Sequence, residues 1–393
     1  MTTAGHMILL LMALPLTLSC AYLLVLTLLS GAPGNPPRSN RLIKFDVIVP
    51  AHNEASIIER TIASLKKVDW PDDRYRIQVI ADNCTDGTAK IARAAGAIAT
   101  ERRDSTRRGK GYALDFAFAA SRQTGWADAV VVVDADAEVS SNLLEAFAAR
   151  LENGAHAVQA HYGVLNPFES WRTRLITIAK AAFHIVRSRA RERLGLSCGI
   201  RGNGWCVTHA LLSRVPYQAF SLTEDLEYGI DLGLANVRVA YADEAHSDAD
   251  MASSEKIAGK QRQRWESGRF QLIRSKAIPL LSTAIRRRSL LCFDLAMDLL
   301  ILPLSYVALD AIGLIVLAGL FALIDIRFLH WLWTGIACTA VLAIYVLRGW
   351  QLSGIGRQGL TDMVRVPGFL LWKILLITKL QKTTEWIRTE REK

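Results

Sequence analysis

The sequence predicts an α/β domain built on a doubly wound, mostly parallel sheet, with transmembrane helices flanking it. Apolar runs typical of buried strands alternate with segments of helical periodicity between residues 45 and 134. Apolar stretches long enough to span a bilayer lie near both ends of the chain. The 393 residues leave room for one large domain plus membrane helices, and the 51% hydrophobic content is high for a purely soluble protein.

The first apolar stretch runs from Met7 to Leu29 and carries no charge. A secretory signal peptide is one interpretation, but a basic segment does not precede the stretch and a long polar chain follows it. We therefore expect residues 1–30 to be an N-terminal transmembrane anchor. Residues 31–40, rich in proline and glycine, then link the anchor to a soluble domain that we place at 31–278.

The soluble domain alternates strands and helices from its start. An apolar strand at 45–50 is followed by a helix at 55–67, whose apolar residues recur at helical spacing. A second strand at 76–81 leads through a polar turn into another helix, and a helix at 112–121 precedes the strand at 129–133. Short loops between alternating strands and helices are typical of a parallel sheet.

The C-terminal part is predicted to be membrane-associated. We expect an interfacial helix region at 279–302, in which Asp294 and Asp298 face water, because ionisable side chains are costly inside a bilayer. Two transmembrane helices should follow at 303–347, and residues 348–393 should form a basic, amphipathic cytoplasmic tail.

The charges predict the orientation. Of the 47 Lys and Arg residues, only Arg327 lies in a stretch that the three-span arrangement places outside. By the positive-inside rule the domain and the tail face the cytoplasm, which indicates a multi-pass protein of the inner membrane. The net charge of +10 suits anionic lipids and phosphate ligands. Nucleic acid is not an expected partner, because the basic residues are spread out and form no known binding module.

The segment Asp134-Ala135-Asp136 follows the strand at 129–133. Side chains at i and i+2 leave a strand in the same direction, so the two carboxylates converge. Such a pair is costly unless a cation neutralises it, and hard divalent ions prefer carboxylate oxygens. The crevice beyond the carboxyl ends of parallel strands is also where α/β sheets bind nucleotides. An ordinary turn is the alternative interpretation.

Six motifs in a fixed order resemble those of the membrane-bound family 2 glycosyltransferases, the group of cellulose, hyaluronan and chitin-oligosaccharide synthases. The resemblance covers roughly residues 44 to 270. It implies a GT-A fold, a UDP-sugar donor, Mg2+ or Mn2+ as cofactor, and inversion at the anomeric carbon. The motifs are Val49-Pro50-Ala51-His52-Asn53-Glu54, Asp82, Gly109-Lys110-Gly111, Asp134-Ala135-Asp136, Thr223-Glu224-Asp225 and Gln261-Arg262-Gln263-Arg264-Trp265.

The resemblance implies a role for each residue of the donor site. Asp134 would contact the nucleotide sugar and, with Asp136, hold the metal ion. Lys110 would meet the diphosphate as a point charge; the alternative is a solvated basic loop that also contains Arg102, Arg103, Arg107 and Arg108. The nucleoside would be held by Ala51, His52, Glu54 and Asp82, although Asp82 is also interpretable as a helix-capping turn residue.

Asp225 is the predicted catalytic base, since direct inversion needs a carboxylate that removes the proton of the attacking hydroxyl. Glu224 is expected to orient the loop or the acceptor beside it. Ser221-Leu222-Thr223-Glu224 also matches a capping box at a helix start, and both interpretations are compatible.

Gln261, Arg264 and Trp265 share one face of a helix. Gln261 and Arg264 would contact the donor, and Trp265 would offer the acceptor a flat surface. The alternative is a basic helix lying on the membrane surface. Gly204 and Trp205, in a glycine-rich segment, would also contact the acceptor, with a tight packing turn as the alternative.

The predicted activity is the transfer of a sugar from a UDP-sugar to form a β-glycosidic bond in extracellular polysaccharide synthesis. Two alternatives stay open: transfer of a single sugar to a lipid-linked acceptor at the inner leaflet, and a non-catalytic scaffold that binds sugar nucleotides. The expected partners are the UDP-sugar, a glycan or lipid-linked acceptor, the lipid bilayer, and export partners or further copies of the chain.

Overall fold

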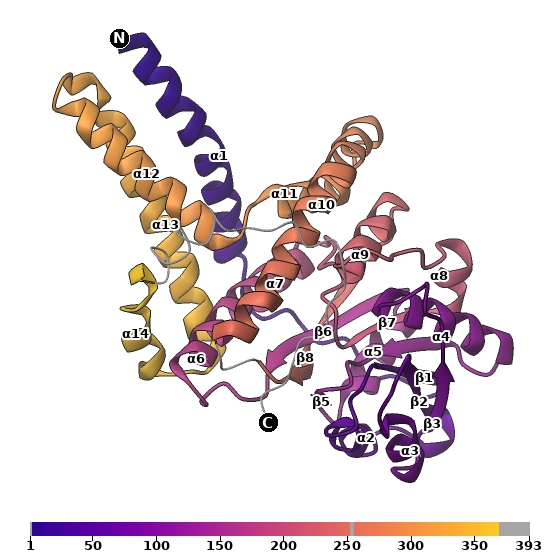
Figure 1. Ribbon diagram of the computed structural model, residues 1–393. Coiled ribbons are helices and arrows are strands. Elements are labelled where there is room, and N and C mark those ends of the chain that lie inside the picture. Colours follow the sequence, from indigo (N-terminus) through magenta and orange to yellow (C-terminus); the bar gives the residue numbers. More distant parts are fainter. Residues whose placement is uncertain (1, 252–254, 369–393) are drawn as a thin grey trace.

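An eight-stranded sheet forms the centre of the globular part of the computed structural model, which describes residues 2–251 and 255–368 (Figure 1). The strand order is β3-β2-β1-β4-β7-β6-β8-β5. The strands are β1 (Phe45–Ala51), β2 (Tyr75–Asp82), β3 (Ile98–Arg102), β4 (Ala129–Val132), β5 (Ala137–Val139), β6 (Ala157–Val164), β7 (Trp205–Thr208) and β8 (Val239–Ala249).

The first half of the sheet is parallel, as the alternation of strands and helices predicted. Strand β1 lies between β2 and β4 and pairs in parallel with both. Strand β7 pairs antiparallel with β4 and β6, and β5 pairs antiparallel with β8. The prediction of an open, mostly parallel sheet in a GT-A fold is confirmed.

Both faces of this sheet are covered, which explains the continuous apolar strands. Val47 and Val131 pack on one face with Ile58 of α2, whereas Ile48 and Val132 pack on the other. The helices on the first face are α2 (Ile58–Leu65), α3 (Thr88–Ala94) and α5 (Leu143–Glu152), and those on the second are α4 (Lys110–Thr124), α8 (His209–Arg214) and α9 (Glu224–Leu234). A short 3-10 helix, η1, spans Asp72–Arg74.

Three long apolar helices pack together and extend away from the sheet domain (Figure 1). By length and composition, Thr3–Leu28, Leu304–Ala322 and Ile326–Ser353 are candidate membrane spans within the described residues. They contain α1 (Thr2–Leu28), α12 (Leu304–Ala322), η3 (Ile326–Phe328) and α13 (Leu329–Ser353).

The remaining helices connect the sheet domain to this bundle. Ion pairing between Arg174 and Asp362 (2.5 Å) joins α6 to α14, and α6 also packs against α13. The part of the predicted basic tail from 369 to 393 lies outside the described residues. These helices are α6 (Trp171–Lys180), the π-helix η2 (Ala181–Val186), α7 (Arg187–Arg193), α10 (Glu255–Arg287), α11 (Leu290–Leu300) and α14 (Arg357–Met363).

One expectation for α11 is wrong. Asp294 and Asp298 do not face water: they are 4% and 3% exposed. Arg191 of α7 pairs with both carboxylates at 2.8 Å, and Arg187 pairs with Asp298 at 2.9 Å. Oppositely charged partners therefore offset the desolvation cost that would otherwise hold these carboxylates in solvent.

Candidate active site

The predicted acidic pair lies at the point in the sheet where successive strands stop being added on one side of β1 and begin on the other. Strands β2 and β3 extend the sheet on one side of β1, and β4 begins the other side. Asp134 follows β4, and its backbone N–H donates to Asn203 Oδ1 (3.0 Å), while the N–H of Gly204 donates to Val132 O (3.0 Å). These bonds fix Asp134 at a topological switch point, where open α/β sheets bind ligands.

Lys110 is the centre of the charged site. Its Nζ lies 2.6 Å from Asp134 Oδ1 and 3.7 Å from Glu224 Oε1, and it donates to Gly202 O at 2.6 Å. Lys110 is the first residue of α4, where a Cβ on Gly111 would lie 2.3 Å from a backbone oxygen. The small residue lets the helix start approach the adjoining loop, and so positions the lysine among the carboxylates.

Glu224 and Asp225 reach the same place from the first turn of α9. A Cβ on Gly202 would lie 3.0 Å from Asp225 Oδ2, so Asp225 adjoins the carbonyl that Lys110 contacts. Burial raises the pKa of Glu224 to about 7 and also raises the pKa of Asp225, while Lys110 opposes both shifts. Carboxyl groups with raised pKa values are suited to accept a proton near neutral pH.

The capping-box alternative at this helix start is not what the structure shows. Thr223 is the residue that precedes α9, and among the described residues its hydroxyl makes no capping hydrogen bond. The backbone N–H of Ser221 instead donates to Glu227 Oε2 (3.0 Å). Glu224 is thereby left facing Lys110 rather than closing the helix end.

The predicted nucleoside residues meet between the ends of β1 and β2. His52 Nδ1 lies 2.7 Å from the backbone oxygen of Asp82, and the N–H of Glu54 donates to Thr88 Oγ1 (2.8 Å). Ala51 ends β1 and is buried. Ala51, His52, Glu54 and Asp82 therefore lie together at the carboxyl ends of β1 and β2, and β1 also pairs with β4, the strand that leads to the acidic pair.

Arg102 also belongs to this region, although no motif in the sequence singles it out. It is not part of a solvated basic loop, because it is 9% exposed and its Nη1 lies 2.6 Å from Asp82 Oδ1. Its Nη2 also pairs with Asp104 (3.1 Å). Strand register could have identified it, because Arg102 ends β3, which pairs with β2, and lies opposite Asp82.

The acidic pair has the donor chemistry of a divalent cation site. Asp134 and Asp136 are partly exposed, and the carbonyl of Asp136 accepts from Arg60 Nη2 (3.2 Å). Within the described residues, no three His, Cys, Asp or Glu side chains are grouped closely enough to hold a metal by themselves. The two carboxylates nevertheless offer hard oxygen ligands, and phosphate oxygens of a bound donor commonly complete such a site.

The α10 motif adjoins this site. Gln261 and Arg264 are half-buried, and Trp265 is 42% exposed. Burial raises the pKa of Tyr162 in β6 well above its ordinary value; the charge of Asp134 adds to the shift, and the charge of Arg264 opposes it. A Cβ on Gly268 of α10 would lie 2.6 Å from Thr223 Cγ2, so α10 packs against the residue that precedes Glu224 and borders the site on this side.

Gly204 and Trp205 do not form the predicted acceptor pocket. Trp205 is 1% exposed and packs against Phe118 and Tyr228 in the core beneath α4 and α9. Gly204 has a φ of +67°, and a Cβ there would lie 2.6 Å from Ser247 Cβ. The segment is a tight packing turn, because the chain just before β7 lies against Ser247 of β8 and Ala160 of β6.

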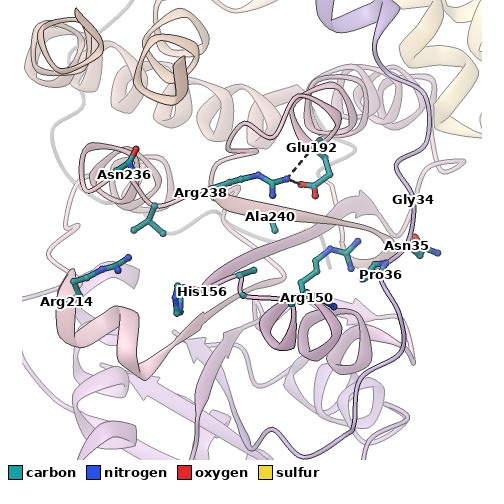
Figure 2. Close-up of a pocket in the computed structure, with 14 residues that line it drawn as sticks. Gly34, Asn35, Pro36, Arg150, His156, Glu192, Arg214, Asn236, Arg238 and Ala240 are labelled. Carbon is teal, nitrogen blue, oxygen red and sulfur yellow. Dashed lines mark hydrogen bonds and ion pairs between the residues drawn. The ribbon is translucent and has the colours of Figure 1, made fainter. Parts of the chain in front are cut away.

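A separate pocket of about 570 Å3 lies near the amino ends of β6 and β8 (Figure 2). Gly34 and Pro36 of the linker border it, as do Arg150 and the Arg238–Glu192 ion pair (2.5 Å). Within the described part of the chain, none of the predicted site residues lines this pocket. This pocket is therefore distinct from the site at the carboxyl ends of the strands.

Comparison with known families agrees with this geometry. The Glycosyl transferase family 2 model matches residues 46–207, and the Glycosyl transferase family group 2 model matches residues 129–375. The chain belongs to glycosyl transferase family group 2. The matched region of this glycosyltransferase contains Asp134, Asp225 and Arg264, together with two of the three apolar helices.

Two curated relatives resemble part of this glycosyltransferase. A probable glycosyltransferase, YdaM, from Bacillus subtilis is 25% identical over 58% of this chain and 55% of its own length. A beta-monoglucosyldiacylglycerol synthase from Nostoc is 26% identical over 57% of this chain and 48% of its own length. The chain thus spans about half the length of the curated relatives that it matches.

A solved structure shares the fold of this glycosyltransferase. The mannosyltransferase PcManGT from Pyrobaculum calidifontis, in complex with GDP-Man and Mn2+, is 19% identical and has a TM-score of 0.51. The match covers 87% of this chain and 98% of that chain. The match is therefore not confined to the sheet domain.

Proposed function

We propose that this chain is an inverting, metal-dependent glycosyltransferase that transfers a sugar from a UDP-sugar at the membrane surface. The observation that carries the proposal is the convergence of Asp134, Glu224 and Asp225 on Lys110 at the switch point of the sheet. A scaffold that only binds sugar nucleotides has no need for a partly buried carboxylate with a raised pKa beside the donor site.

Asp225 acts as the base. As the acceptor oxygen forms its bond to the anomeric carbon, the bond from that carbon to the diphosphate breaks on the opposite side, and the nucleoside diphosphate leaves with the electron pair. The proton of the acceptor hydroxyl passes to Asp225, so the donor's α linkage becomes a β linkage. Glu224 holds the Lys110 ammonium beside this carboxylate.

Asp134 and Asp136 would hold Mg2+ or Mn2+. Such an ion supplies positive charge to the departing diphosphate. Lys110 adds a fixed cation beside Asp134, and Arg264 supplies a planar guanidinium from α10. Ala51, His52, Glu54 and Asp82 hold the nucleoside, with Arg102 fixing the Asp82 carboxylate. Gln261 completes the donor side, and Trp265 offers its exposed ring to the acceptor.

We favour a membrane lipid as the acceptor, with transfer of a single sugar at the inner leaflet. The three candidate spans among the described residues enclose little space for a polymer, and one relative is named a beta-monoglucosyldiacylglycerol synthase. Extension of an extracellular polysaccharide, which the resemblance to the processive synthases implies, requires export partners or further copies of the chain. In either case the sheet domain faces the cytoplasm and the chain is a multi-pass protein of the inner membrane.

The test is to incubate membranes containing the protein with a panel of UDP-sugars and to separate products by length and lipid attachment. We expect one added sugar on an organic-soluble product. A ladder of water-soluble oligosaccharides would favour polysaccharide extension instead. If no donor is consumed although UDP binds, the scaffold interpretation replaces the enzymatic one.

A further inference from the structure

A cluster of buried charges lies between the candidate active site and the membrane helices. Asp298 is its centre: Arg187 and Arg191 contact its Oδ1 at 2.9 and 2.8 Å, and Arg201 approaches its Oδ2 at 3.4 Å. We call this set the arginine cluster. It comprises Arg187, Arg191, Arg201 and Arg269 with Asp294 and Asp298.

The arginine cluster is not electrically balanced. It has four guanidinium groups and two carboxylates, and within the described part of the chain Arg269 donates only to the backbone oxygens of Asp298 and Ile301. Burial lowers the pKa of Arg201, and it lowers the pKa of Arg269 to about 10. A buried excess of positive charge is costly unless an anion compensates it.

Several N–H groups of the cluster also lack acceptors. Among the described residues, no hydrogen-bond partner contacts Arg191 Nη1, Arg201 Nε or Arg269 Nε, although all three atoms are buried. Arg191 is 0% exposed and Arg201 is 6% exposed. Ion pairs that served only to hold α11 in place would not leave such strong donors unused, since buried polar groups are normally hydrogen-bonded.

The cluster is connected to the reacting groups on one side and to the membrane helices on the other. Arg201 directly precedes Gly202, whose carbonyl accepts from Lys110 and whose Cα adjoins Asp225. On the other side, Arg191 donates to Tyr22 of the candidate span α1 (2.6 Å). Figure 1 shows α11 between α1 and α10. An anionic headgroup at the cluster would lie between its own acyl chains in the bilayer and the base.

We propose that the arginine cluster binds the phosphate group of the lipid acceptor. A phosphate offers three strong acceptor oxygens to the unused guanidinium N–H groups and balances the excess charge. A hydroxyl of the same headgroup then meets Asp225. This inference rests on the proposed function, and it narrows the acceptor from lipids in general to lipids that carry a phosphate.

The test is a binding measurement on the full chain in non-ionic detergent, without nucleotide sugar. Dioctanoyl phosphatidic acid, dioctanoyl glycerol and inorganic phosphate are titrated separately by calorimetry. Arg269→Gln removes one charge of the cluster but keeps an amide donor, and Arg201→Lys keeps the charge but loses the planar fork. The matched control is Arg189→Gln, on the same helix as Arg191 but paired with Asp243 (2.7 Å) outside the cluster.

We expect phosphatidic acid to bind at least on the order of tenfold more tightly than dioctanoyl glycerol, and Arg269→Gln to weaken it by a similar factor. Arg189→Gln should leave the affinity unchanged within about twofold. Equal binding of the two lipids, or no loss in either cluster variant, would overturn the proposal. If inorganic phosphate binds as tightly as phosphatidic acid, the site serves free phosphate and the lipid assignment is wrong.

The same titration separates this inference from the proposed function. Asp136→Ala is expected to abolish transfer but to keep the affinity for phosphatidic acid, since Asp136 is not a member of the cluster. Binding by a protein that transfers no sugar from any donor would support the arginine cluster while contradicting the proposed function. Transfer to a neutral lipid with no binding of phosphatidic acid would support the proposed function and contradict the phosphate-binding role of the arginine cluster.

Discussion

Replacing Asp225 with asparagine should stop transfer while leaving donor binding nearly intact. Asparagine keeps the volume of the side chain and one oxygen, but it cannot take a proton from the acceptor. Lys110 keeps its contacts with Asp134 (2.6 Å), Glu224 (3.7 Å) and the Gly202 carbonyl, so the donor side of the site should hold its arrangement.

The expected effects of Asp225→Asn on the transfer rate and on UDP affinity differ in size. Loss of a positioned general base typically costs about 10²–10⁴ in rate. The change in UDP affinity should stay within about fivefold, or less than about 1 kcal/mol, because Lys110 keeps two of its three carboxylate neighbours. A large fall in kcat with a nearly constant affinity is the signature of a group that acts in the transition state.

The assay is transfer of labelled sugar by purified protein in detergent, with UDP binding measured by calorimetry on the same preparation. Glu227→Gln is the matched control, because Glu227 lies in the first turn of the same helix but accepts from the Ser221 N–H. We expect Glu227→Gln to retain activity. Wild-type turnover by Asp225→Asn would show that another residue takes the proton, and Glu224→Gln would then be the variant to examine.

Three further predictions follow from the site. Arg264→Lys should lower the rate of transfer more than the affinity for the UDP-sugar. Trp265→Ala should raise the KM for the acceptor by an amount equivalent to about 1–3 kcal/mol. If these variants lose membrane association but keep unchanged kinetics in detergent, this face of α10 lies on the lipid surface instead. As the pH is lowered, kcat/KM should begin to fall at a pH above the ordinary carboxyl range. The reason is that the base must be deprotonated, and burial raises the pKa values of Asp225 and Glu224. A fall that begins only near about pH 4 would contradict this. Trp205→Ala should destabilise the domain by about 3–5 kcal/mol, because it leaves a cavity in the core. Trp205→Phe should leave the KM for the acceptor unchanged. A changed KM for the acceptor in Trp205→Phe would show that Trp205 does contact the acceptor.

The sequence was sufficient for the sheet and for the acidic pair because both depend on local patterns. Alternating burial places Val47 and Val131 on one face and Ile48 and Val132 on the other, so the strands are apolar throughout. A carboxylate that follows such a strand must lie at the sheet's carboxyl edge, whichever strands are its neighbours. Asp134 was predictable for that reason.

The errors concern side chains whose surroundings come from distant parts of the chain. Asp294 was expected in water because its partner, Arg191, lies 103 positions earlier. Arg102 looked like part of a basic loop, although strand register sets it opposite Asp82. Trp205 follows two glycines and seemed accessible, but β7 inserts between β4 and β6 and buries it. Burial and charge pairing at this range are not encoded in a local pattern.

The proposed function requires that the Asp134–Asp136 pair binds a divalent cation and that transfer depends on this cation. The most direct measurement is transfer of labelled sugar from a UDP-sugar by metal-free protein, with and without added Mn2+, for wild type, Asp136→Ala and the neighbouring control Glu138→Gln. We expect no transfer without metal, recovery with Mn2+ in the wild type and in Glu138→Gln, and no recovery in Asp136→Ala. Full activity of metal-free wild type in EDTA, or of Asp136→Ala with Mn2+, would contradict it.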